Sequence, residues 1–170
     1  MIFLGLGSNL SSKFGDRFAN INLAISFLEG YGIKVIKKSN FYETPSYPNK
    51  ENPKFINAVI LVETTLPPVD LMSVLIFIEE KLERKRGKKN DPRTCDIDII
   101  DYNNQILNLR YNNLNITAPH KELTSRNFIL FPLHEISPKW KHPKTKEIIN
   151  VLLQKLSEDD KNSILKIDKN

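Results

Sequence analysis

The pattern of apolar and polar residues predicts alternating strands and helices over the first part of the chain. A short apolar run at residues 2–6 indicates a buried strand, and the turn-forming residues 7–9 follow it. Residues 33–42 show a second strand-like pattern. Gly30 and Gly32 are expected to end the helix between these strands. Its apolar residues recur at helical spacing: Phe18, Ile21, Ile25 and Leu28.

The pattern of strand, helix and strand is repeated after a long loop. Residues 44–54 contain three prolines and almost nothing to bury, so we expect a loop there. Residues 57–65 are nearly continuous in β-branched and apolar side chains, which is typical of a central strand covered on both faces. Pro67 and Pro68 then begin a predicted helix. The apolar stripe of that helix is Leu71, Leu75, Ile78 and Leu82.

A basic segment leads from this helix to one more strand-like run, so the predicted order is β-α-β-β-α-β. This is the split order of a ferredoxin-like α+β sandwich. Residues 107–143 show a less regular pattern, residues 148–156 have the pattern of a helix, and a polar tail follows. We therefore predict one ferredoxin-like domain over residues 1–170, with C-terminal additions.

Composition narrows the class of protein. A hydrophobic content of 40% with 26% charged residues is typical of a folded protein. The longest apolar patch is far too short to span a membrane, and the first residues lack the basic leader of a signal peptide. The single cysteine, Cys95, excludes an intramolecular disulfide and is expected to be a small buried residue. We therefore expect a cytoplasmic protein without a membrane partner.

Candidate chemistry is concentrated in the strand-like run that begins at Asp96. Because strand side chains alternate, Asp96 and Asp98 should point to one face, while Ile97 and Ile99 point to the other. Aspartate is depleted from strands, and two adjacent carboxylates repel each other unless a cation lies between them. Carboxylate oxygens suit Mg²⁺, which takes its other ligands from water and substrate phosphates. With Arg93 nearby, the pair favours a metal-and-phosphate site over a solvated strand face.

Positive charge lies directly upstream, at residues 84–89. Arg84 and Arg86 could hold phosphate bidentately, although the same run could be a solvated helix end. The net charge of +5 suits an anionic partner but is too small to argue for nucleic acid. The sequence contains no P-loop, no complete dinucleotide fingerprint and no zinc-ligand spacing.

Six motifs occur in the order found in one family. They are Gly7-Ser-Asn-Leu, Phe41-Tyr-x-Thr-Pro, Phe55-x-Asn-Ala-Val, Glu79 followed by Arg84-x-Arg86, Pro92-Arg-Thr-Cys-Asp-Ile-Asp-Ile, and Pro119-His with Arg126-x-Phe128. Over nearly its whole length the chain resembles the hydroxymethyl-dihydropterin pyrophosphokinases. The resemblance implies an enzyme of folate biosynthesis that transfers the βγ-diphosphate of ATP to 6-hydroxymethyl-7,8-dihydropterin and releases AMP. It also implies a ferredoxin-like fold.

The resemblance assigns roles to the matching positions. Asp96 and Asp98 would bind two Mg²⁺ ions, and Arg84 and Arg93 would stabilise the transferring diphosphate. The pterin would be held by Thr44, Pro45, Tyr47, Phe55, Asn57 and Phe128. The co-substrate ATP would be contacted by Glu79, Arg86, Ile99, His120 and Arg126. We expect small-molecule substrates only, and a monomer.

Two segments, residues 44–54 and 85–91, are expected to act as lids that exclude water. The chain departs from the family in and near the second lid. The family usually has glycine where Glu83 stands, often tryptophan at Asn90, a small residue at Asp91 and an aromatic residue at Lys121. These departures concern the lid contacts and not the acidic pair. No general base for the hydroxymethyl proton is evident from the sequence.

Two alternatives fit parts of the pattern. A nucleotidyltransferase also uses Gly-Ser and Asp-x-Asp, but its aspartates closely follow the Gly-Ser, whereas Ser8 and Asp96 are far apart in this sequence. An RNA-binding ferredoxin-like module needs aromatic residues on its central strands and a basic sheet face. Here residues 57–65 have only Phe55 at their edge, and the acidic pair would repel RNA.

Overall fold

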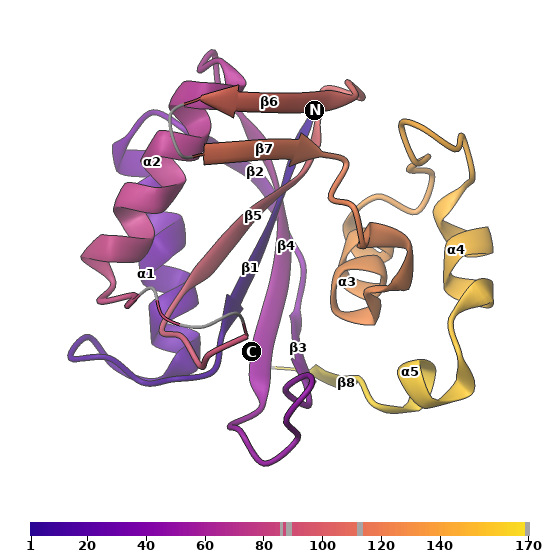
Figure 1. Cartoon of the computed structure of the whole chain (residues 1–170), viewed down its shortest axis with the longest axis horizontal. Coiled ribbons are helices and arrows are strands. Elements are labelled where there is room, and N and C mark those ends of the chain that lie inside the picture. Colours follow the sequence, from indigo (N-terminus) through magenta and orange to yellow (C-terminus); the bar gives the residue numbers. More distant parts are fainter. Residues whose placement is uncertain (86, 88–89, 112–113, 169–170) are drawn as a thin grey trace.

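Six strands form one antiparallel sheet in the computed structural model, which describes residues 1–85, 87, 90–111 and 114–168 (Figure 1). The hydrogen-bonded order is β5-β1-β4-β3-β8, and β2 also pairs with β4. The strands are β1 (Ile2–Ser8), β2 (Lys34–Lys38), β3 (Phe41–Thr44), β4 (Phe55–Glu63), β5 (Asp96–Tyr102) and β8 (Leu165–Ile167). A separate hairpin consists of β6 (Leu107–Tyr111) and β7 (Leu114–Ala118).

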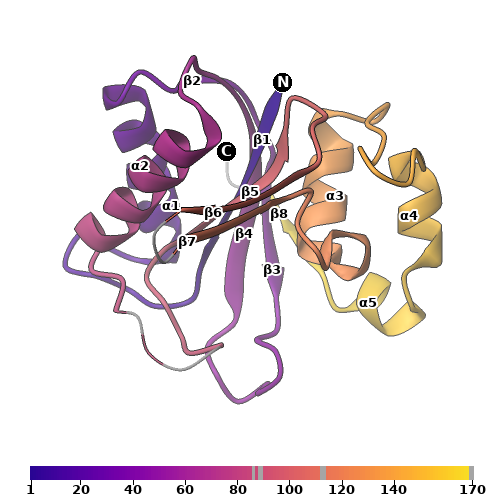
Figure 2. The same ribbon diagram turned by 45° about the horizontal axis from the view of Figure 1, so that its top comes forward.

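Helices cover both faces of this sheet (Figures 1 and 2). On one face lie α1 (Arg17–Gly30), whose first turn is capped by the Asp16 carboxylate, and α2 (Pro68–Lys81), which begins with a proline. On the other face lie α3 (Asn127–Ile136) and α4 (Ile149–Lys155), with the short helices η1 (Leu123–Ser125) and α5 (Glu158–Asn162) nearby. Within the described ranges, no helix has the length and apolarity that crossing a membrane requires.

The two apolar cores of the protein follow from the alternation of side chains along the strands. On β1, Leu4 packs into the core beneath α1 and α2, whereas Phe3 packs into the core beneath α3 and α4. Gly5 faces α3, and a Cβ at this position would lie 2.8 Å from the Cδ1 atom of Ile129. A side chain at position 5 would therefore require the terminal methyl groups of Ile129 and Ile100 to shift. Cys95 is fully buried, as predicted.

The prediction of a single strand over residues 33–42 is wrong in detail. The chain forms β2 and β3 instead, and Ser39 lies between them. The backbone N–H of Ser39 donates to the Val59 carbonyl, while the Ser39 hydroxyl accepts from the Val59 N–H, both at 3.0 Å. A side chain thus replaces one backbone partner of the ladder, which breaks the strand without leaving a buried donor unpaired.

The residue pattern predicts too few helices and strands for the C-terminal third of the chain. Residues 107–143 contain the β6-β7 hairpin and α3, and the polar tail contains α5 and β8. Helix α3 was missed because the continuous apolar run of residues 128–133 hides its helical periodicity and contains Pro132. Strand β8 is three residues long and mostly exposed, so it shows no alternating pattern.

Candidate active site

A cavity of about 1140 Å³ lies on the face of the sheet that α3 covers in part. Its walls come from the ends of β1, β3, β4 and β5, from residues 44–50, from the segment after α2, and from the start of α3. The acidic pair forms part of the wall, as do Arg84, Arg93 and Arg126. The cavity thus brings together five of the charged side chains that the sequence singled out.

The acidic pair is open to the cavity because its neighbours on β1 are glycines. In the antiparallel register Asp96 lies opposite Gly7 and Asp98 lies opposite Gly5. Directly opposite residues point to the same face of a sheet, so a side chain at either glycine would stand beside a carboxylate. Ile97 and Ile99 point into the core on the other face. The predicted division of side chains between the two faces is therefore confirmed.

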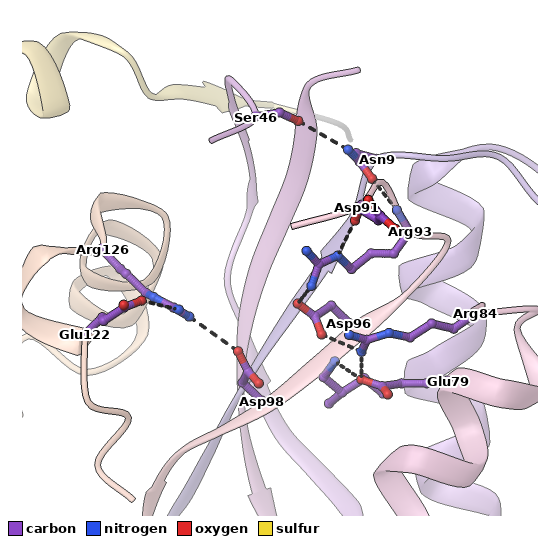
Figure 3. A network of polar contacts seen from close by, with 11 residues as sticks. Asn9, Ser46, Glu79, Arg84, Asp91, Arg93, Asp96, Asp98, Glu122 and Arg126 are labelled. Atoms are coloured by element: carbon purple, nitrogen blue, oxygen red, sulfur yellow. Dashed lines mark hydrogen bonds and ion pairs between the residues drawn. The ribbon is translucent and has the colours of Figure 1, made fainter. Parts of the chain in front are cut away.

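Two arginines from different segments converge on Asp96 (Figure 3). Arg84, just after α2, donates from Nη1 to Asp96 Oδ1, and Arg93 donates from Nη1 to Asp96 Oδ2 at 2.9 Å. Arg84 also donates to the carboxylate of Glu79. Burial lowers the pKa of Arg84, but the charges of Asp96 and Glu79 outweigh this effect and raise it overall. The arginine is therefore firmly charged.

Asp98 has a different environment from Asp96. Its Oδ2 atom lies 3.5 Å from Nη1 of Arg126, which also donates to Glu122 at 2.7 Å. Loss of surrounding water, and then the neighbouring charge of Asp96, raise the pKa of Asp98 to about 6. A carboxyl with this pKa is mostly ionised at neutral pH. Two carboxylates that lie two residues apart on the same face of β5 repel each other, and this repulsion favours a bound cation.

Glu79 is a buried residue that connects α2 with β5. Its side chain is buried, and its Oε1 atom accepts both from Arg84 and from the backbone N–H of Ile97 at 2.8 Å. Glu79 thereby joins the end of α2 to the start of the strand that carries the acidic pair. It does not line the cavity, so its contact with ATP stays a prediction.

We expect Glu79→Leu to lower the free energy of unfolding by roughly 2–4 kcal/mol, because the buried Ile97 N–H loses its acceptor and Arg84 loses a partner. Glu79→Gln keeps an acceptor of the same shape and should cost clearly less. Urea unfolding of both variants measures the difference. Equal stability of Glu79→Leu and the unmodified protein would contradict this account.

The second part of the cavity is formed by β3, β4 and α3. The side-chain amide of Asn57 donates to Thr44 Oγ1 at 3.0 Å and to the Tyr42 carbonyl at 3.3 Å, which fixes its orientation. Phe55 and Phe128 both line the cavity. The guanidinium of Arg93 lies 5.6 Å from the centre of the Phe55 ring, within the range of a cation–π contact.

The remaining predicted residues lie at different depths. Pro45 and Tyr47 line the cavity, and the Tyr47 side chain is 82% exposed. His120 lines the main cavity and also a smaller neighbouring cavity of about 310 Å³, which is lined by Ile99, Asp98 and Arg126 as well. Burial, and then the charge of Arg126, lower the pKa of His120. Arg86 lies outside the described residues.

Asn9 has a connecting role that sequence reasoning did not assign. Its Oδ1 atom accepts from the Arg93 backbone N–H at 2.7 Å, and its Nδ2 atom donates to Ser46 Oγ at 3.2 Å (Figure 3). The Nδ2 atom also donates to the Pro53 carbonyl at 3.0 Å. One side chain therefore holds the loop of residues 44–54 against the segment that carries Arg93. The only signal in the sequence was its place in the Gly-Ser-Asn-Leu motif.

The backbone explains some departures from the family pattern. Glu83 has φ of 65° and Asn90 has φ of 69°, in the left-handed region that favours glycine. The family glycine at position 83 thus fits the backbone, whereas Glu83 is held by contacts with the backbone N–H and the ammonium group of Lys13. A Cβ at Gly87 would collide with the Asp91 carboxylate. The Asp91 carboxylate therefore lies directly against the backbone of Gly87.

A site in which carboxylates are paired with arginines, next to a pocket with aromatic side chains, is typical of an enzyme that transfers phosphoryl groups. Comparison with known proteins identifies the group of enzymes. Residues 3–138 match the family model described as 7,8-dihydro-6-hydroxymethylpterin-pyrophosphokinase (HPPK). The chain belongs to this family.

Similar proteins agree with this assignment. The chain is 36% identical to the 2-amino-4-hydroxy-6-hydroxymethyldihydropteridine pyrophosphokinase of Methylorubrum extorquens, over 80% of this chain and 82% of the relative. It is 32% identical to the enzyme of the same name from Haemophilus influenzae, over 89% of this chain and 91% of the relative.

Longer relatives match only in part. Folic acid synthesis protein fol1 of Schizosaccharomyces pombe is 35% identical over 91% of this chain, but the chain spans about a fifth of its length (20%). A crystal structure of wild-type Plasmodium falciparum HPPK-DHPS superposes with a TM-score of 0.72 at 18% identity. The superposition covers 91% of this chain and 44% of that protein. At 18% identity this likeness is evidence for the fold and not for the function.

Proposed function

We propose that this chain transfers the βγ-diphosphate of ATP to the hydroxymethyl oxygen of 6-hydroxymethyl-7,8-dihydropterin and releases AMP, as a step of folate biosynthesis. The observation that carries this proposal is that one cavity holds both the carboxylate–arginine cluster around Asp96 and the amide and aromatic residues around Asn57. A phosphate-transfer site and a site for a planar heterocycle are thus neighbours, in a chain that belongs to the pyrophosphokinase family.

The proposed reaction balances without a covalent enzyme intermediate. The hydroxymethyl oxygen attacks the β-phosphorus of ATP, the bond from this phosphorus to the α,β-bridging oxygen breaks, and AMP leaves with that oxygen. No side chain is assigned as the acceptor of the hydroxymethyl proton, and the proposed reaction therefore releases this proton to solvent. Positioning and neutralisation of charge lower the barrier of such a transfer. Arg84 and Arg93 would stabilise the negative oxygens of the diphosphate.

Asp96 and Asp98 would hold two Mg²⁺ ions. Groups of three or more metal-ligating side chains are absent from the described residues, but Mg²⁺ needs only one or two carboxylates when phosphates and water complete its shell. The two aspartates, open to the cavity above the glycines of β1, fit this requirement. Bound there, Mg²⁺ supplies charge neutralisation at the phosphate oxygens.

The two substrates would occupy different parts of the cavity. The pterin would lie between the rings of Phe55 and Phe128, with Asn57 on its edge and Thr44, Pro45 and Tyr47 beside it. ATP would extend from the acidic pair towards the smaller cavity, in contact with Glu79, Arg86, Ile99, His120 and Arg126. The oriented amide of Asn57 supports this division, because a fixed donor-acceptor group suits the edge of a heterocycle.

We also propose that residues 1–170 form one ferredoxin-like domain that acts as a cytoplasmic monomer on small molecules. The strand order β5-β1-β4, followed by β2 and β3 at the far side of β4, supports the fold class. The carboxylates exposed in the cavity argue against nucleic acid as the ligand.

The proposed function is tested by the product of the reaction. When the protein is incubated with Mg²⁺, ATP and 6-hydroxymethyl-7,8-dihydropterin, we expect AMP to accumulate in equal amount to the pterin diphosphate. Chromatography of the nucleotides measures it, and a reaction without pterin is the control. Pterin-dependent formation of ADP, or AMP that forms equally well without pterin, would show that the proposed reaction is wrong.

A further inference from the structure

The C-terminal segment, defined as residues 157–167, contributes to the wall of the cavity although it lies beyond the residues that match the family model. It contains α5, a turn and β8 (Figure 1). Asp159, Asp160, Asn162 and Ser163 line the same cavity as Phe55, Asn57 and Phe128. None of these four residues belongs to a motif that the sequence analysis singled out.

One end of the segment is bonded to the start of α3 through Asn127. The Asn127 side chain is buried, and its Nδ2 atom donates to the Asp160 carbonyl at 2.6 Å and to Ser163 Oγ at 3.1 Å. The Ser163 hydroxyl in turn donates to the Asp160 carbonyl at 3.2 Å. Phe128 is the next residue of the same helix. Any shift of the segment is therefore transmitted directly to the backbone that carries this ring.

The other end of the segment is paired with β3. Register places Tyr42 opposite Lys166 and Glu43 opposite Leu165. The Tyr42 carbonyl accepts from the amide of Asn57, so β8 supports the strand that orients this amide. An ion pair of 3.6 Å between Lys166 and Glu135 ties β8 to α3 as well.

We propose that the C-terminal segment positions the pterin side of the active site, with Asn127 and Ser163 as positioning residues. The proposal rests on the function proposed above. The segment holds Phe128 through α3 and Asn57 through β3, so that ring and amide keep a fixed separation. On the nucleotide side, the guanidinium of Arg126 is held by the carboxylates of Asp98 and Glu122, and it also lies 5.5 Å from the centre of the Phe128 ring. The two carboxylate contacts involve no residue of the C-terminal segment.

The test measures the affinity for the pterin and the affinity for the nucleotide separately. For Asn127→Ala, which removes two hydrogen bonds, we expect the dissociation constant of 6-hydroxymethyl-7,8-dihydropterin to rise about tenfold. Titration calorimetry with Mg²⁺ and a non-hydrolysable ATP analogue measures it. The dissociation constant of the analogue alone should change less than about twofold, since Arg126 keeps its two carboxylate partners, Asp98 and Glu122.

Matched variants separate positioning from general loss of structure. Ser163→Ala should weaken pterin binding roughly threefold, whereas Ser163→Thr keeps the hydroxyl and should restore it. Lys161→Ala, which removes an ion pair with Glu158 in the same segment, is the control and should leave both affinities unchanged. Thermal unfolding of each variant confirms that the fold is retained.

The outcomes distinguish this inference from the proposed function. If the unmodified protein forms pterin-dependent AMP but Asn127→Ala binds pterin and nucleotide as the unmodified protein does, or loses both affinities equally, the positioning role is overturned. Should Asn127→Ala fail to fold, equal pterin affinity of Ser163→Ala and Ser163→Thr overturns it. If the unmodified protein forms no AMP but binds pterin, and the variants weaken that binding selectively, the positioning role stands while the proposed reaction fails.

Discussion

Asp96→Asn and Asp98→Asn are each expected to lower turnover at least about a hundredfold while the fold is retained, because the neutral amide is a poor ligand for Mg²⁺. Asparagine keeps the size of the side chain, so the packing of β5 should not change. At position 96 the substitution also removes the charge that faces Arg84 and Arg93. The larger effect on stability is therefore expected at position 96 and the smaller at position 98.

Steady-state AMP formation and urea unfolding of the same preparations measure these two effects. Asp70→Asn is a suitable control, since Asp70 is exposed in the first turn of α2, outside the cavity lining. A rise in the Mg²⁺ concentration needed for half-maximal activity would point to weakened metal binding specifically. Near-normal turnover of both variants at low Mg²⁺ would make the pair structural and remove the proposed metal site.

Arg84→Ala is the second substitution for which we expect a large effect, a fall in turnover of roughly 10²–10³-fold. The guanidinium lies between the carboxylates of Glu79 and Asp96 and donates to both. It can present two parallel N–H groups to a phosphate, whereas lysine offers a point charge. Arg84→Lys should therefore recover only part of the lost rate, although it restores the net charge.

Stability must be measured with the rate in this case. Arg84→Ala leaves the buried Glu79 without one of its partners, which by itself should lower the free energy of unfolding. A variant that is destabilised but turns over normally at a temperature where it is folded would show that Arg84 serves the structure only. Loss of rate with the fold retained would support its role at the diphosphate.

The sequence predicted those parts of the fold that depend on local periodicity. The face of β5 that carries Asp96 and Asp98 follows from the alternation of side chains, and the start of α2 follows from its prolines. Helix α3 was not predicted, because its pattern is almost uniformly apolar around Pro132. Strand β8 depends on the edge that β3 offers, and a three-residue exposed strand has no periodicity of its own.

The charged residues of the candidate site were predictable from the sequence, because neighbouring carboxylates and arginines have a direct use in binding Mg²⁺ and phosphate. Asp96, Arg84 and Arg93 do meet in the cavity. The links among segments were not predictable, because they use backbone partners that are distant in sequence. Asn9 bonds to the backbone at Arg93 and Pro53, and neither contact leaves a pattern in the residues around it.

Because Asp96 is paired with two guanidinium groups, the affinity for the proposed metal ion and the affinity for the nucleotide should depend on each other. A metal ion that approaches Asp96 must compete with Arg84 and Arg93 for its oxygens. A phosphate chain offers those arginines an alternative partner and so releases the carboxylate. Metal and nucleotide would then bind with positive heterotropic linkage, and by reciprocity each would raise the affinity of the other by the same factor. The enzyme would thus take up the two as a unit and bind neither well alone.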